Sequence, residues 1–558
     1  MSIIFSLLIL GLAVIVSWPL GKGMVWAMHP SEHVGRFRQA MEALFQKAGG
    51  ALTAHGQDWK AYCGSMILFN ACMFAVAFAL LSLQQVLPLN PDGKGALDPS
   101  LIFNTVASFT SNTNLQHYSG EVSMSYFSQL FALMWLQFVS AATGIAALAA
   151  LCRGLAGKTE IGNFYQDLMR ATFLVLLPLA VVLAVLLVLG GVPMTLDGAA
   201  TAKTLEGTMQ TIARGPVAAF VAIKQLGTNG GGFFGPNSTH PFENPSFFTN
   251  IITCVSIPLI PMACVWMFGR LTGRMRHAVI IFSVMLVMLA VKVGLAVYLE
   301  SAPAAAFSGL PVQVTGNLEG KELRFGTAAG PVWSAITTAT SNGSVNCMHD
   351  SLNPLTGLVP LVGMWLNVTF GGVGVGLINM FVYVIVGVFI CGMMVGRTPE
   401  YMGRKVETHE MKLALLALLV HPLFILGGTA LFASTAWGLS TVHNPGAHGF
   451  TEILYEFSSA AANNGSGFEG LGDNTVPWNV ATGIIMLLAR FLPIILPLAI
   501  AGSLATKKPT PETAGTLRTD TPLFGWVILG SVVFIGALLF LPVAVLGPIA
   551  EHLAGFGK

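Results

Sequence analysis

The chain has 558 residues, of which 54% are hydrophobic and only 9% are charged, and its mean hydropathy is +0.72. Soluble domains carry roughly 25% charged residues, so this composition excludes a soluble protein and indicates a polytopic membrane protein. The net charge of +2 gives no sign of a nucleic-acid partner. The seven cysteines form no C-x-x-C pair, so neither a zinc site nor a disulfide scaffold is indicated.

Ten stretches are apolar over the length of about 20 residues that a membrane span needs. They are 2–20, 62–86, 126–151, 168–192, 247–269, 278–299, 355–396, 413–436, 477–504 and 522–546. The first has neither a basic segment before it nor a small-residue cleavage site, which favours an uncleaved span over a signal peptide. The sequence thus predicts an all-α membrane protein with ten transmembrane helices.

Lysine and arginine concentrate in alternate connections between these stretches. The connections 21–60, 152–170, 270–276, 397–412 and 505–520 hold 18 of the 27 basic residues, against seven in the other loops and the C-terminus. Basic residues mark the cytoplasmic side of membrane proteins. We therefore expect these five connections in the cytoplasm and both termini on the outer side.

Four short polar turns recur on the expected outer side: S-N-T-N at 111–114, T-N-G-G at 228–231, S-N-G-S at 341–344 and N-N-G-S at 463–466. Aligned on the second residue, Asn112, Asn229, Asn342 and Asn464 lie 117, 113 and 122 residues apart. A semi-apolar segment precedes each turn, with Pro99, Pro216 or Pro331 as its first residue or Thr451 as its N-cap. A 12-residue helix is about 18 Å long, roughly half the hydrocarbon core. We expect four half-length helices whose partly negative C-terminal ends point to the membrane centre.

Four such loops around one pseudo-four-fold axis would supply a ring of oxygens for a cation. Gly230, Gly231, Gly232, Gly343 and Gly465 permit the backbone angles that turn carbonyl groups inward. The first loop has Thr113 and Asn114 instead. Asn-Gly is also an ordinary turn dipeptide, so a surface turn is the alternative for any single copy. The near-equal spacing of four copies favours the cation pathway.

Acidic residues follow the four turns, namely Glu121, Glu243, Asp350 and Glu469. A ring of carboxylates at an outer mouth concentrates cations, although each of these acids could also be an ordinary solvated loop residue. Gln116 could reach over the same mouth or stabilise its own turn.

The seventh apolar stretch is twice too long, because 42 helical residues would span about 63 Å. Its middle reads F-G-G-V-G-V-G at 370–376, with Gly371, Gly372, Gly374 and Gly376. Glycine costs roughly 1 kcal/mol per residue in a helix. We expect the helix to break here into an intramembrane gating loop beneath the four turns; the alternative is a close-packed glycine interface between helices.

Two basic residues fall inside predicted spans. A guanidinium in a membrane is costly and usually functional, so Arg490 is expected either to oppose direct cytoplasmic exit of an ion or to tether the gating loop; the alternatives are snorkelling or a structural ion pair. Lys292 lies nearer the outer end of its span and is expected to snorkel to the interface.

Several motifs that would point elsewhere are incomplete. R-G-L-A-G-K-T at 153–159 lacks the first glycine of a P-loop, since Cys152 stands there, and no D-K-T-G phosphorylation sequence occurs. Among the twelve histidines, only His421 is clearly within a span, which argues against a haem-binding redox protein. The sequence therefore offers no catalytic residue and no resident cofactor.

Longer motifs carry a family resemblance: S-F-T-S-N-T-N-L-Q-H-Y-S-G-E (108–121), G-T-N-G-G-G-F-F (227–234), N-S-T-H-P-F-E-N-P (237–245), M-H-D-S (348–351), G-R-T-P-E-Y (396–401) and N-N-G-S-G-F (463–468). The chain resembles, over essentially its whole length, the potassium-binding subunit (KdpA family) of the bacterial Kdp-type potassium-transporting ATPase, in the superfamily of potassium transporters. The resemblance implies four fused helix–pore-loop–helix units at 61–152, 153–270, 271–397 and 398–505, with extra spans in 1–60 and 506–558.

The resemblance also implies a function and site residues. The implied potassium filter is Asn112, Thr113, Asn114, Asn229, Gly230, Gly231, Gly232, Asn342, Gly343, Ser344, Asn464, Gly465 and Ser466, with the gating loop at 370–376 and Arg397 on the following turn. The implied setting is the bacterial inner membrane, and the implied partners are a P-type ATPase subunit that uses ATP and Mg²⁺, a single-span accessory subunit and a small one-helix peptide. A stand-alone potassium channel or gradient-driven transporter of the same architecture remains the alternative.

Overall fold

The computed structural model describes residues 2–29, 35–303, 316–394, 396, 398–510 and 518–556. These residues are mostly helical. Their only strands form two antiparallel hairpins, β1 (Ala200–Lys203) with β2 (Met209–Ile212) and β3 (Glu400–Tyr401) with β4 (Arg404–Lys405). Ten helical segments in the described ranges are long and apolar enough to cross a membrane, which confirms the predicted all-α fold and number of spans. The protein is a multi-pass membrane protein.

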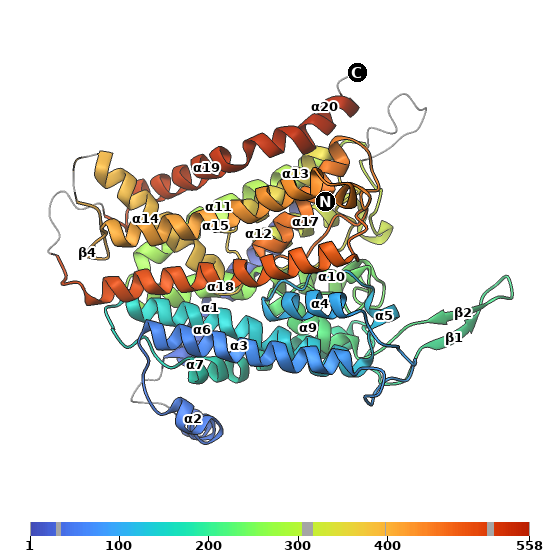
Figure 1. The fold of residues 1–558 in the computed structure, drawn as a ribbon, viewed down its shortest axis with the longest axis horizontal. Helices are drawn as coiled ribbons and strands as arrows, with labels where there is room; N and C mark the ends of the chain where they lie inside the picture. Colours follow the sequence, from blue (N-terminus) through green and yellow to red (C-terminus); the bar gives the residue numbers. More distant parts are fainter. Residues whose placement is uncertain are drawn as a thin grey trace.

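The long helices lie side by side in one bundle (Figure 1). They are α1 (Ser2–Met28), α3 (Trp59–Ser82), η2 with α6 (Ser128–Met134, Trp135–Leu155), α7 with η3 and α8 (Phe164–Arg170, Ala171–Leu176, Leu177–Leu189), α10 (Phe247–Leu271), α11 (Met275–Glu300), α14 (Val375–Met394), α15 (Thr408–Ala433), α18 (Val476–Thr506), and α19 with η7 and α20 (Pro522–Ala544, Val545–Ile549, Ala550–Phe556). Shorter helices connect them: α2 (Arg36–Gly49), η1 (Gly50–Thr53), α5 (Gly120–Ser123), η4 (Asn237–Thr239), η6 (Leu323–Phe325) and α16 (Ala436–Leu439).

The two ends of the bundle differ in what they carry. In Figure 1, α2 and β4 lie at one end, whereas the β1–β2 hairpin, α5 and α20 lie at the other. α2 and β4 belong to connections that are rich in lysine and arginine. The two basic connections that hold α2 and β4 therefore share one end of the bundle (Figure 1), as an alternating topology requires.

Four short helices sit inside the bundle without crossing it: α4 (Pro99–Thr110), α9 (Val217–Leu226), α12 (Gly326–Ala339) and α17 (Ala447–Ala462). α4 begins at Pro99 as predicted, and Asp98 caps it by accepting from the Ser100 N–H at 2.8 Å. The other three predicted starts are wrong. Pro216 precedes α9, while Pro331 and Thr451 lie inside longer helices, because tertiary packing extends those helices beyond the local start signals.

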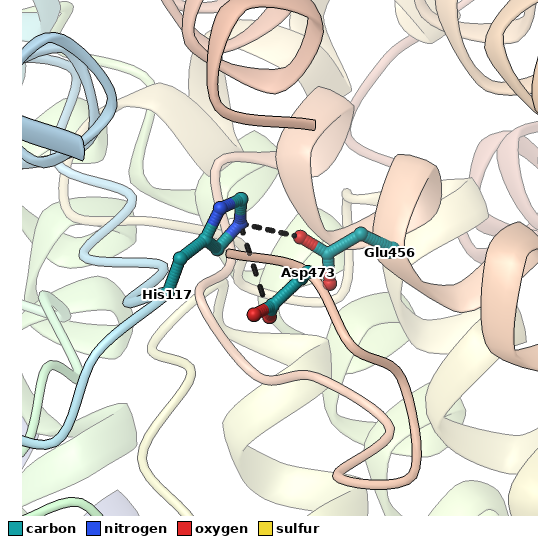
Figure 2. A group of neighbouring side chains, drawn as sticks. All are labelled: His117, Glu456 and Asp473. Carbon is teal, nitrogen blue, oxygen red and sulfur yellow. Dashed lines mark hydrogen bonds and ion pairs between the residues drawn. The ribbon is translucent and has the colours of Figure 1, made fainter. Parts of the chain in front are cut away.

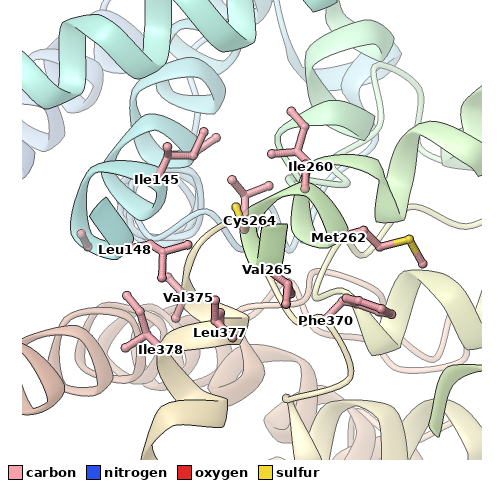
Figure 3. Close-up of a cluster of buried hydrophobic side chains, with 14 of the residues drawn as sticks. Ile145, Leu148, Ile260, Met262, Cys264, Val265, Phe370, Val375, Leu377 and Ile378 are labelled. Carbon is pink, nitrogen blue, oxygen red and sulfur yellow. The ribbon is translucent and has the colours of Figure 1, made fainter. Parts of the chain in front are cut away.

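The seventh apolar stretch is interrupted where the glycines predict it. α13 (Pro354–Leu366) and α14 are separated by the non-helical residues 367–374. This linker packs between α6 and α10: Figure 3 shows Phe370 near Val265 of α10, and Val375, the first residue of α14, near Leu148 of α6. All of these side chains are buried, so the linker is part of the protein core.

Candidate functional site: a ring of four loops

Each of the four half-helices ends in a loop that folds back onto its own helix. In every loop one backbone N–H donates to the carbonyl group five residues earlier. The bonds are Thr113 N to Ser108 O (2.9 Å), Asn229 N to Lys224 O (2.9 Å), Asn342 N to Thr337 O (2.8 Å) and Asn464 N to Ser459 O (2.9 Å). The four loops therefore have the same hydrogen-bonded framework.

The backbone angles establish the same equivalence. φ is positive on both sides of each donor: Asn112 and Asn114 (65°, 56°), Thr228 and Gly230 (47°, 80°), Ser341 and Gly343 (49°, 88°), Asn463 and Gly465 (51°, 105°). The alignment on Asn112 is therefore wrong by one residue, since Thr113 is the equivalent of Asn229. Asn114 stands where the other loops have glycine, and asparagine adopts this left-handed conformation more readily than most residues.

Neighbouring loops are hydrogen-bonded into a closed ring. Asparagine side chains make these links: Asn229 Nδ2 to Asn112 Oδ1 (2.7 Å), Asn342 Nδ2 to Lys224 O and Gln225 O (both 3.2 Å), Asn464 Nδ2 to Thr337 O (3.1 Å) and Asn463 Nδ2 to Thr113 Oγ1 (2.9 Å). The first three links join each unit to the one before it, and the last joins the fourth unit to the first. The sequence predicted that the turns converge, and these bonds bring them together.

Glycine is required where adjacent loop backbones touch. A Cβ atom on Gly343 would overlap the carbonyl group of Asn464, and one on Gly465 would overlap that of Thr113. Both residues also have the positive φ that side chains disfavour. The ring can close only because these residues have no side chain.

Four carbonyl oxygens at equivalent places remain without a hydrogen-bond donor among the described residues. They belong to Thr113, Asn229, Asn342 and Asn464, each next to the C-terminal end of a half-helix. Buried carbonyl groups are rarely left unpaired, and helix C-termini carry about −0.5 charge. The ring therefore offers a cation unpaired oxygens in a negative potential.

Other expected filter groups are already engaged. The carbonyl oxygens of Gly230, Gly232 and Ser344 accept hydrogen bonds from Asn237 Nδ2 (2.6 Å), Gln116 Nε2 (3.0 Å) and Trp333 Nε1 (2.8 Å), respectively. Ser466 Oγ donates to Asn464 Oδ1 at 2.6 Å, and Gly231 lies against the side chain of Asn114. In this structure Gly230, Gly232, Ser344 and Ser466 brace the loops, because these polar groups are bonded to protein.

The linker 367–374 lies directly against the ring. Gly371 N donates to Ala339 O (3.0 Å), Val373 N to Thr228 Oγ1 (3.0 Å) and Asn367 Nδ2 to Ala462 O (3.1 Å). It thus contacts three of the four units at the ends of their half-helices. Gly371, Gly372 and Gly374 belong to the linker, and Gly376 is the second residue of α14. Arg397 lies outside the described residues.

Arg490 on α18 lies beside the linker and is 3% exposed. Its Nη2 donates to Ser140 O of α6 at 3.0 Å, and it forms no ion pair within the described part of the chain. Arg490, Asn367 and Gly372 line a narrow cavity of ≈ 50 Å³. A buried cation therefore borders the space next to the linker and the ring.

Residues 7–553 match the sequence model of the family described as the potassium-transporting ATPase A subunit (KdpA). The chain belongs to this family. It is also 48% identical over 550 residues to a potassium-transporting ATPase potassium-binding subunit of Geobacillus kaustophilus (strain HTA426), an alignment that covers 98% of each chain. The match extends over nearly the whole of this KdpA-family chain, including the four loops.

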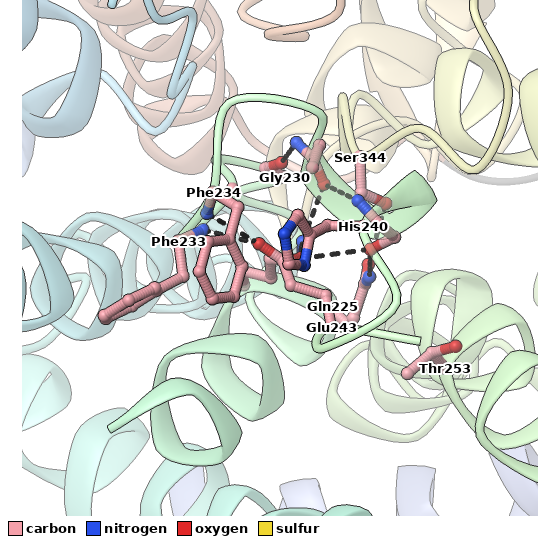
Figure 4. Close-up of polar contacts among 12 residues, drawn as sticks. Gln225, Gly230, Phe233, Phe234, His240, Glu243, Thr253 and Ser344 are labelled. Atoms are coloured by element: carbon pink, nitrogen blue, oxygen red, sulfur yellow. Dashed lines mark hydrogen bonds and ion pairs between the residues drawn. The ribbon is translucent and has the colours of Figure 1, made fainter. Parts of the chain in front are cut away.

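A buried ion pair supports the second loop of this KdpA-family ring. Lys224, near the end of α9, pairs with Glu243, and both side chains are fully buried. Glu243 also accepts from the N–H groups of Phe233 (2.7 Å) and Phe234 (3.1 Å), as Figure 4 shows. Lys224 Nζ donates to Asn237 Oδ1 at 2.6 Å, and Asn237 in turn holds Gly230. The expectation that Glu243 faces the outer mouth is therefore wrong.

A cavity of ≈ 320 Å³ forms the mouth of the ring on the side away from the linker 367–374. Gly343, Gly465, Gln116 and Glu469 line it. All three acids are engaged: Glu469 accepts from the Asp350 N–H (3.2 Å), Glu121 accepts from the Gly235 N–H (2.7 Å), and Asp350 pairs with His448 (2.9 Å). A ring of four carboxylates is thus not present at this mouth. Gln116 spans two loops, because its amide group pairs with both the N–H and the carbonyl group of Gly232.

His117 forms a cluster at the same mouth that the sequence did not reveal (Figure 2). Its Nε2 lies 3.1 Å from Glu456 Oε1 and 3.9 Å from Asp473 Oδ2, and its Nδ1 lies 2.7 Å from Asn479 Oδ1. Burial alone would lower the pKa of His117, but the charges of Asp473 and Glu456 and the hydrogen bonds outweigh it and raise the pKa to about 9. A protonated His117 therefore ties the first loop to the fourth unit.

This raised pKa makes the contribution of His117 to stability depend on pH. The free histidine titrates near 6.5, so the contribution is complete below pH 6.5 and is lost as the pH rises through about 9. We expect the melting temperature of the wild type to exceed that of His117→Gln by most at pH 6 and by least at pH 10. Thermal melts of both proteins at each pH test this. A difference that is constant with pH would contradict it, and titrating groups that do not interact with His117 cancel in the comparison.

Proposed function

We propose that this chain is the potassium-binding subunit of a potassium-transporting P-type ATPase and that it takes potassium from the outer side in the ring of four loops. The observation that carries the proposal is the closed ring with unpaired carbonyl oxygens at Thr113, Asn229, Asn342 and Asn464. Membership of the family and the name of the Geobacillus relative support the choice of potassium.

The ring meets the physical needs of a potassium filter. A dehydrated potassium ion must recover about eight oxygen contacts, which rings of backbone carbonyls supply. Four more carbonyl oxygens lack a hydrogen-bond donor among the described residues: those of Asn112, Asn114, Gly343 and Gly465. Each belongs to a residue next in sequence to one of the four equivalent carbonyl groups. We assign the loops to a pseudo-four-fold axis and the chain to four repeats at 61–152, 153–270, 271–397 and 398–505, with an extra span at each end.

An external energy source is part of this proposal. A passive pore can only equilibrate potassium with the membrane potential, which is worth about 2.3 kcal/mol per 100 mV. Uptake of potassium from dilute medium needs more free energy than the membrane potential supplies. We therefore infer partners that resemble those of Kdp-type complexes: a P-type ATPase subunit that binds ATP and Mg²⁺, a single-span accessory subunit and a small single-helix subunit. The setting is a bacterial inner membrane, with the basic end of the bundle in the cytoplasm and both termini in the periplasm.

The linker 367–374 is the gating loop in this scheme. It closes the direct path below the ring, and Arg490 adds a positive charge that opposes straight passage of a cation into the cytoplasm. The ion would then leave sideways, toward the ATPase subunit.

Heavy-ion density tests the site directly. In the purified complex soaked with rubidium or thallium, density is expected at the centre of the ring, within bonding distance of the carbonyls of Thr113, Asn229, Asn342 and Asn464. Density elsewhere only, at saturating ion, would overturn the proposal. Co-elution of a P-type ATPase with the tagged chain separates this function from that of a stand-alone channel, which needs no such partner.

A further inference from the structure

Lys292 lies on α11 and does not snorkel, which corrects the sequence-based expectation. Its side chain is buried, with the residue only 6% exposed, and eight residues, or about 12 Å of helix, separate it from Glu300. Nζ donates to Thr369 Oγ1 at 2.7 Å and forms no ion pair with the described residues. A buried amine without an acidic partner is costly, so its one contact, with the linker, needs an explanation.

The linker that receives this bond has a strained backbone. Asn367 and Phe370 have φ values of 46° and 66°, although neither is glycine. A bulky residue such as Phe370 keeps a positive φ only when its surroundings enforce it. The Phe370 ring packs against Phe282 of α11, with the centroids 5.2 Å apart. α11 therefore holds two consecutive linker residues, one by a hydrogen bond and one by ring packing.

The other side of the linker contacts the ring and α6. Val373 N donates to Thr228 Oγ1, and the backbone around Val373 and Gly374 touches Gly144 of α6, next to Arg490. Lys292 thus holds the Thr369 end of the linker, and Arg490 lies near the Val373 end. Through these contacts, α11 holds one end of the linker while the other end stays against the ring.

We propose that Lys292 is a positioning residue for ion transfer: its bond to Thr369 keeps the strained linker closed beneath the ring, and the linker opens when this bond breaks. The inference rests on the proposed potassium function. Without the bond, strain at Phe370 favours opening, and passive flow of ions through the ring increases.

The test measures passive ⁸⁶Rb⁺ uptake into vesicles that contain the purified full-length chain, without ATP. Lys292→Met removes the donor at similar length, and Thr369→Val removes the acceptor at the same shape. Each is expected to raise the initial rate at least about tenfold, the value of a buried hydrogen bond to a charged group. The rubidium dissociation constant, measured in detergent by calorimetry, is expected to stay within about threefold.

Two control variants make the result specific. Thr369→Ser keeps the hydroxyl group, and Val291→Ala changes an exposed neighbour of Lys292. Both are expected to retain the wild-type rate. Unchanged uptake in both Lys292→Met and Thr369→Val would overturn the inference. If these two variants lost uptake and rubidium binding to the same extent, the inference would also be overturned. That result would mean that the bond only supports the folded structure. A wild-type chain that binds no rubidium would instead refute the proposed function.

Discussion

Gly343→Ala is expected to weaken potassium binding by at least about a hundredfold, or about 2.7 kcal/mol. The added Cβ would overlap the backbone of Asn464, and φ at this position is 88°. Overpacking against backbone costs typically 1–3 kcal/mol, and a left-handed conformation adds about 1–2 kcal/mol. The fourth loop would have to move away from the third, so the carbonyl of Asn464 would leave the ring. Isothermal titration with potassium in detergent measures the effect.

A matched control lies in the linker below. A Cβ on Gly372 would find its nearest atom at 3.6 Å, an ordinary contact, so Gly372→Ala is expected to bind potassium within about threefold of wild type. Both variants add one methyl group. If Gly343→Ala bound potassium as tightly as Gly372→Ala, close contact between the third and fourth loops would not be needed for binding.

Lys224→Met is expected to lower the free energy of unfolding by about 3–5 kcal/mol, because it leaves the carboxylate of Glu243 buried without its cation. The same change frees Asn237, which holds Gly230. We therefore expect a lower melting temperature in detergent, compared at one scan rate, together with weaker potassium binding.

The double variant Lys224→Met, Glu243→Gln separates charge from packing. It removes both charges and keeps an oxygen that can accept from Phe233 and Phe234, so it is expected to recover part of the lost stability. A double variant no more stable than Lys224→Met would show that the unpaired charge is not the cause. Stability lost without any change in potassium binding would show that the pair does not support the ring.

The sequence predicts the fold well because membrane spans depend on local composition. Ten apolar stretches become ten spans, Pro99 begins α4, and the glycine-rich residues 370–376 break the seventh stretch, each from signals within about 20 residues. The recurrence of the polar turns also predicts that they converge. Such features need no knowledge of distant contacts.

The misassigned residues all depend on contacts that are distant in sequence or on backbone angles. The first loop lacks a glycine, so its register could not be read from the letters; the backbone hydrogen bonds and the φ values identify Thr113 as the equivalent of Asn229. His117 meets Glu456 across 339 residues, and Lys292 meets Thr369 across 77. Burial of Glu243 likewise depends on Lys224, a partner 19 residues earlier.

Because all four loops belong to one polypeptide, a mutation changes one quarter of the ring at a time. In a homotetrameric channel any substitution at such a position appears four times and affects every subunit. Here asparagine at 114 coexists with glycine at 230, 343 and 465, and the second quarter has the buried Lys224–Glu243 pair behind it. A ring within one chain thus allows its four sides to change independently, in smaller steps than four identical subunits permit.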